Sequence, residues 1–180
     1  MRKNGLLIYW SLYLILLAWF SLGHLSFSII DLLQLRQLDH SLNLIPFEHL
    51  PLRNQQIDIQ LLIYKIILLF PLGIGLKITF DNKQHLLKDL KVVFLVSLML
   101  EILDYGLGLG NFDSTTVLIY TLGSFLGIMF YQVMHCLLPR QRLNSLLTKG
   151  GIWGFGSLTG FIITLFIFNS PLYRFLSNLI

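Results

Sequence analysis

Three ionisable residues stand in stretches of the sequence that are otherwise strongly apolar. Glu101 and Asp104 lie in the run KVVFLVSLMLEILDYGLG, and Lys65 lies in IQLLIYKIILLFPLG. A charged side chain in the middle of a membrane helix costs about 2.5–3.5 kcal/mol on insertion scales, so such residues need a role. The three side chains offer two kinds of chemistry, which are proton transfer by a carboxyl group and mutual neutralisation of acid and base.

The depths of these residues predict that they lie close together. At about 1.5 Å per residue, Lys65 lies about 9 Å below the surface at which its helix begins. Glu101 and Asp104 lie about 15 and 20 Å from the opposite surface of a core about 30 Å thick. We therefore predict a cluster of Lys65, Asp104 and Glu101 between the second and third membrane helices, open toward the exterior. Whether Lys65 pairs with Asp104 or with Glu101 stays open at this point.

The composition explains why these charges stand out. The chain has 180 residues, of which 55% are hydrophobic and 12% are charged, and its mean hydropathy is +0.73. Several apolar runs approach the ~20 residues with which a helix crosses a bilayer. The sequence therefore predicts an all-α integral membrane protein, a single multi-pass domain over residues 1–180 located in the cell membrane, with the lipid bilayer as its first partner.

Five apolar runs define the helices that must position the charges. We expect about five transmembrane helices, over the ranges Gly5–Leu22, Ile59–Phe80, Leu90–Leu107, Thr116–Leu138 and Gly151–Phe168. Asp113 or Ser114 is expected to cap the fourth helix, because either side chain can accept from its first N–H groups. Gly123 and Gly127 predict close packing of that helix against a partner.

The distribution of basic residues predicts the orientation. With the N-terminus inside, nine basic residues face the cytoplasm and three face the exterior, which satisfies the positive-inside rule. The polar segment Gly23–Asp58 then lies outside, between helices 1 and 2, and we expect extended or irregular structure there. Residues 139–180 are predicted to hold a cytoplasmic loop, an extra transmembrane helix and a short interfacial helix over 172–179.

Several function classes lack support in the sequence. The basic residues form no patch with interleaved aromatic residues, so we expect no nucleic-acid partner. Cys136 is the single cysteine, and the spacing of His40 and His49 matches no metal-ligand pattern, so we expect neither a metal nor a cofactor. No Ser, Cys or Thr has a partner base at a recognisable spacing, which favours a protein that is not an enzyme.

A set of short motifs is shared with a known family. The motifs follow in the order NLIPF (43–47), LFPLG (69–73), Glu101, GNFD (110–113) and LGSFLG (122–127). Over residues 12–131 this order and spacing resembles the VanZ-like membrane proteins of Gram-positive and other bacteria. Founding members of that family are associated with low-level resistance to teicoplanin-type lipoglycopeptides. The resemblance therefore implies a multi-pass membrane protein of the cell envelope with a link to antibiotic resistance.

The resemblance also identifies residues and departures. Asn43, Glu101, Asp113 and the Pro and Gly positions match the family pattern, whereas family members usually carry Asn at 65, Gln at 104, Asp at 116 and Asn at 120. In this chain those four positions hold Lys65, Asp104, Thr116 and Tyr120. The residues expected to form a binding site are Asn43, Pro46, Phe47, Lys65, Glu101, Asp104 and Asp113.

Three functions remain open at this point. The first is a non-enzymatic interaction of the exterior face with an envelope lipid or an amphiphilic small molecule. The second is an enzyme or carrier that acts on a lipid-linked envelope intermediate, with Glu101 as the catalytic acid or base. The third is a component of a small-molecule transporter.

Overall fold

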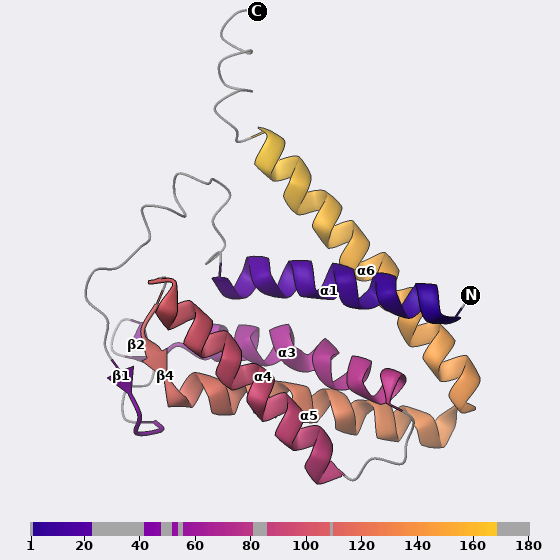
Figure 1. Ribbon diagram of the computed structural model, residues 1–180, viewed down its shortest axis with the longest axis horizontal. Coiled ribbons are helices and arrows are strands. Elements are labelled where there is room, and N and C mark those ends of the chain that lie inside the picture. The colour runs from indigo at the N-terminus through magenta and orange to yellow at the C-terminus, as the bar shows by residue number, and fades with distance from the viewer. Residues whose placement is uncertain are drawn as a thin grey trace, which may run out of the picture. The chain divides into compact units, whose positions relative to one another are not determined.

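Helices make up most of the part of the chain that the computed structural model describes, which is residues 2–22, 42–47, 52–53, 56–80, 86–108 and 110–168. Figure 1 shows these helices, which are α1 (Arg2–Leu22), α3 (Ile59–Thr79), α4 (Leu86–Gly106), α5 (Ser114–Leu137) and α6 (Arg140–Phe168). The predicted all-helical architecture is confirmed. The chain divides into two compact units, one of residues 1–36 with 146–180 and one of residues 37–145.

Three of these helices, α3, α5 and α6, are long and apolar enough to cross a membrane. The apolar part of α1 is shorter and covers Asn4–Phe20. In α4 the apolar sequence is interrupted by five charged residues, which are Lys88, Asp89, Lys91, Glu101 and Asp104. The five expected spans therefore each correspond to a helix, and among the described residues α3, α5 and α6 meet the requirements of a span.

Helices α3 and α5 pack closely through glycines. A Cβ atom at Gly127 would overlap the backbone oxygen of Phe70, and one at Gly123 would overlap the backbone oxygen of Ile66. The buried hydroxyl of Ser124 donates to the backbone oxygen of Leu69 at 2.9 Å. Residue numbers increase along both helices from contact to contact, so α3 and α5 run in the same direction. The close packing predicted from Gly123 and Gly127 is confirmed.

Helix α4 runs in the opposite direction and buries one stripe of side chains. The stripe consists of Asp89, Val93, Ser97 and Glu101, one residue in every four. At the start of α4, Asp89 forms an ion pair with Lys77 near the end of α3, and both residues are almost completely buried. The directions of α3, α4 and α5 thus alternate, as consecutive membrane spans require.

Two pairs of very short strands accompany the helices. Strand β1 (Leu42–Asn43) pairs in parallel with β4 (Phe112–Asp113), so that Asn43 lies opposite Asp113. Strand β2 (Leu52–Arg53) pairs antiparallel with β3 (Gln56–Ile57). Within the described part of the segment over residues 23–58, the expected extended structure is therefore present. We call the end of the unit of residues 37–145 at which α3 and α5 begin and α4 ends the capped end, because Asp58 and Asp113 cap α3 and α5 there.

Helix α6 begins eleven residues earlier than the apolar run predicts. Pro139 precedes its first residue, and RQRLNSLLTK consists mostly of residues that favour helix, so the polar stretch expected as a loop continues the helix instead. The Tyr131 hydroxyl donates to Asn144 Oδ1 at 2.7 Å and joins the end of α5 to the first turns of α6. The interfacial helix expected over residues 172–179 lies outside the described residues.

In the other unit, α1 packs on the apolar part of α6 through aromatic side chains. The buried rings of Tyr9 and Tyr13 lie 5.3 and 5.6 Å from the ring of Phe155, measured between centroids. Gly151 leaves the space that the Tyr9 ring occupies, because a Cβ atom there would overlap that ring.

Candidate functional site

Asp113 joins a strand to a helix at the capped end. It has an extended backbone and caps α5, because its Oδ1 atom accepts the Thr115 N–H at 2.9 Å. Short side chains with an acceptor oxygen stabilise a helix start in this way, and removing such a cap costs about 0.5–2 kcal/mol. Of the two cap residues expected from the sequence, the structure selects Asp113.

The segment from Leu42 to Phe47 is fastened to this helix start. Asn43 Nδ2 donates to Asp113 Oδ1 at 3.3 Å, which adds to the pairing of the two strands. The Phe47 N–H donates to Thr115 Oγ1 at 2.9 Å. Phe47 has a φ of 67°, a conformation that costs a residue with a side chain about 1–3 kcal/mol, so the surrounding contacts must hold it.

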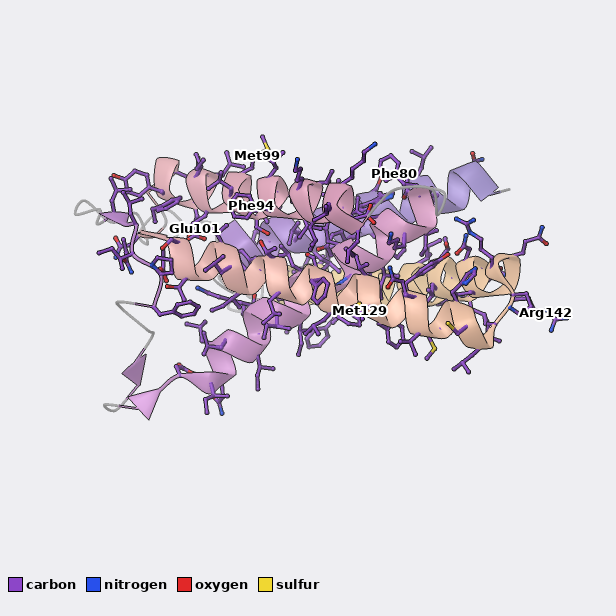
Figure 2. The ribbon with its side chains drawn as sticks, turned by 90° about the horizontal axis from the view of Figure 1, so that it is seen from below. Phe80, Phe94, Met99, Glu101, Met129 and Arg142 are labelled. Carbon is purple, nitrogen blue, oxygen red and sulfur yellow. The ribbon has the colours of Figure 1, made fainter. Side chains whose placement is uncertain are left out.

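Glu101 fastens the other side of the same turn. Its Oε1 atom accepts the backbone N–H of Asp113 at 3.0 Å, and the residue is 5% exposed. Figure 2 shows Glu101 at the end of α4 beside the start of α5, whereas Met99, two residues earlier, points away from the helices. The carboxylate in the middle of the apolar run thus binds a backbone group that would otherwise be left without a partner.

Lys65 reaches the same cap from α3. Its ammonium group donates to Thr116 Oγ1 at 2.6 Å, and the Thr116 hydroxyl in turn lies 3.4 Å from Asp113 Oδ2, to which it can donate. Lys65 also lies close enough to Glu101, Asp113 and Asp104 to interact electrostatically with all three. The structure therefore brings together the cluster expected from the depths of these residues, with Asp113 and Thr116 as added members.

Asp104 lies against the turn that connects α4 to β4. A Cβ atom at Gly110 would lie 2.6 Å from Asp104 Oδ2, so a side chain at this position would displace the Asp104 carboxylate. The depth estimate places Asp104 near Lys65, and both Asp104 and Glu101 interact electrostatically with its ammonium group.

The outward face of the fastened segment is apolar. Leu42, Leu44, Ile45 and Phe47 are between 59% and 70% exposed, and Pro46 at the turn is also exposed. Asn43 is half-buried and turned toward Asp113. Six residues therefore present apolar side chains on one side and polar contacts to the helix cap on the other.

Sequence reasoning missed Thr115 and Thr116 as members of the site, and it missed the second charged pair. Lys77 lies twelve residues after Lys65, and Asp89 lies twelve residues before Glu101. In two helices that run in opposite directions, equal spacings place both lysines opposite both carboxylates. This matched spacing is a signal in the sequence that could have identified the Lys77–Asp89 pair.

Metal ligands are lacking in the part of the chain that the structure describes, where no group of three His, Cys, Asp or Glu residues could hold a metal ion. His40 and His49 lie outside the described residues. Cys136 is a free, exposed thiol near the end of α5.

Comparison with known proteins identifies the family. The model of the family described as VanZ/LLP1 matches residues 10–135, a range that contains β1, β4, α3, α4 and all but the last two residues of α5. The chain belongs to the VanZ/LLP1 family. It is also 30% identical to Protein VanZ of Enterococcus faecium over 150 residues, which are 83% of this chain and 86% of that protein. No solved structure matches. The expected VanZ-like resemblance is confirmed. We call Lys65, Glu101, Asp104, Asp113 and Thr116 the capped-end cluster, and all five residues lie inside the matched range.

Proposed function

We propose that this VanZ-like protein is a multi-pass protein of the bacterial cell membrane whose capped end faces the exterior and binds an amphiphilic molecule of the envelope. In this proposal all five helices cross the membrane, with the N-terminus inside. The alternating directions of α3, α4 and α5 and the excess of basic residues in the segments assigned to the cytoplasm support this arrangement.

The observation that carries the proposal is the fastened segment Leu42–Phe47. Its polar contacts with Asp113 and Thr115 fix it in place, and its apolar side chains are left exposed. A surface with polar groups beside fixed apolar side chains suits a ligand that has a polar head and an apolar chain. An envelope lipid or an amphiphilic small molecule has this chemistry.

The contacts of Glu101 favour binding over catalysis. A general acid or base must have an oxygen within reach of the proton that it transfers. In Glu101 one oxygen already accepts the Asp113 N–H and holds the turn, and the residue is nearly inaccessible. We therefore assign Glu101 to the support of the binding surface and propose a non-enzymatic function.

Family membership supports a specific consequence of this binding. The resemblance to VanZ-like proteins implies a link to teicoplanin-type lipoglycopeptides, which are themselves amphiphilic. We propose that the protein lowers the sensitivity of the cell to such compounds by an interaction at its exterior surface.

Expression in a lipoglycopeptide-sensitive Gram-positive host tests the proposal. The wild-type protein should raise the inhibitory concentration of teicoplanin, and Thr115→Val should remove most of this effect because it releases the Phe47 N–H. The matched control is Thr121→Val on the same helix, whose hydroxyl donates only to Val117 within α5. Membrane abundance is measured for every variant. Unchanged sensitivity and unchanged envelope composition on wild-type expression would refute the proposal.

A further inference from the structure

The backbone of the segment Leu42–Phe47 is fixed, so its apolar side chains cannot turn inward and become buried. Three contacts hold it, which are the β1–β4 pairing, the Asn43–Asp113 hydrogen bond and the hydrogen bond from the Phe47 N–H to Thr115. The left-handed backbone of Phe47 fixes the direction in which its side chain leaves the turn. Leu44, Ile45 and Phe47 therefore stay exposed in the folded protein.

The segment lies at the end of the unit where two apolar helices begin, and this position indicates what surrounds its exposed side chains. It is attached to the first residues of α5, and α3 begins at the same end of the unit. Both helices are long and apolar enough to cross a membrane. When α3 and α5 cross a bilayer, a segment joined to the first turn of α5 lies at the boundary between headgroups and acyl chains. Exposed Leu, Ile and Phe side chains are stable at that boundary.

We propose that Leu42–Phe47 is inserted into the leaflet in which α3 and α5 begin, with Leu44, Ile45 and Phe47 in contact with lipid acyl chains. The capped-end cluster then lies directly beneath a lipid-embedded turn. A ligand with an apolar chain would reach the cluster sideways from the leaflet. The insertion rests on the part of the proposed function in which α3 and α5 cross the membrane, and this last step rests also on its proposed ligand.

Spin-label accessibility tests the insertion on the full chain. Replacing the single cysteine by Cys136→Ser gives a background in which one label is introduced by Ile45→Cys or Leu44→Cys. Both positions are exposed, so labelling removes no packing contact. The purified protein is reconstituted in vesicles of phosphatidylcholine and phosphatidylglycerol, and collision rates with oxygen and with a water-soluble Ni(II) chelate are compared.

Two labelled variants provide the references. Met99→Cys reports the apolar outer surface of α4, and Arg142→Cys reports an exposed polar position at the start of α6, both labelled in Figure 2. We expect labels at 44 and 45 to collide with oxygen several-fold more often than with the chelate, as at Met99. Chelate collisions at the level of Arg142 would overturn the proposal, and so would low accessibility to both reagents, because protein rather than lipid would then cover the segment. No ligand is added, so this result is independent of the teicoplanin experiment.

Discussion

Glu101 uses its carboxylate to accept a backbone N–H group, and this determines how it should respond to substitution. Glu101→Gln keeps an acceptor oxygen at the same place, so the variant should retain its abundance and most of its effect on teicoplanin sensitivity. Glu101→Ala leaves the partly buried Asp113 N–H without the Glu101 acceptor, which costs about 1–3 kcal/mol. Thermal unfolding in detergent measures the difference. If Glu101→Gln is abundant and folded but inactive, Glu101 acts as an acid or base after all.

The contact between Lys65 and Thr116 joins two of the positions at which the chain departs from the VanZ-like pattern. The resemblance implies an uncharged Asn at position 65 on α3 and an acidic Asp at position 116 on α5. This chain instead has the basic Lys65 on α3 and the uncharged Thr116 on α5. Lys65 and Asp104 are opposite charges at positions where family members usually carry the uncharged residues Asn and Gln. The observed hydrogen bond shows that Lys65 directly contacts a further departure from the pattern, Thr116.

Helices α3 and α4 carry charged residues at both of their ends. At the end opposite the capped end, the two charged residues contact each other directly. Lys77 and Asp89 form a buried ion pair. Breaking such a pair by removing one partner typically costs about 3–5 kcal/mol, whereas removing both charges is often close to neutral. Lys77→Met should therefore reduce the abundance and thermal stability of the protein strongly, and Lys77→Met with Asp89→Leu should recover most of the loss.

The same pair bears on how α4 enters the membrane, since α4 carries five charged residues. Protease protection of the α3–α4 connection in vesicles reports whether α4 has inserted. A double variant as unstable as the sum of both single variants would show that Lys77 and Asp89 act independently.

The glycine contacts of α3 and α5 predict a strong position dependence of small changes. Gly127→Ala places a Cβ atom into the backbone of Phe70, so the two helices must separate and the folded protein should be lost or destabilised by more than about 2 kcal/mol. Gly154→Ala on α6 is the matched control, because nothing lies within 4 Å of its added Cβ atom. That variant should gain up to about 1 kcal/mol from helix propensity. Equal stability of the two variants would contradict the close packing.

The sequence predicts the helices and the cap more successfully than the contacts between distant segments. Apolar runs identify each helix, and Asp113 before a run is a local signal for a cap. The β1–β4 pairing joins residues seventy positions apart, and a strand of two residues has no periodicity to detect. Thr115 and Thr116 cannot be predicted as site residues because their roles depend on the distant residues that they contact, which are Phe47 and Lys65. The early start of α6 was missed because polar helix-forming residues and polar loop residues look alike in a hydropathy pattern.

At the scale of the whole molecule, the single cysteine tests the proposed orientation. Five spans with the N-terminus inside place Cys136, near the end of α5, on the cytoplasmic side. A membrane-impermeant maleimide should leave intact cells unlabelled and should label inside-out vesicles. The control is Asn111→Cys on the Cys136→Ser background, which should be labelled in intact cells. Labelling of Cys136 in intact cells would reverse the orientation.

The shared direction of α3 and α5 has an electrostatic consequence. Each helix start carries about half a positive charge from its unpaired N–H groups, and parallel packing places two such starts at the capped end. Glu101, Asp104 and Asp113 outnumber the single lysine there, and the two helix dipoles supply part of the missing positive charge. If either helix crossed the membrane in the opposite direction, its negative end would face these carboxylates. The parallel directions of α3 and α5 thus add a favourable interaction with these carboxylates to the close packing at the glycines.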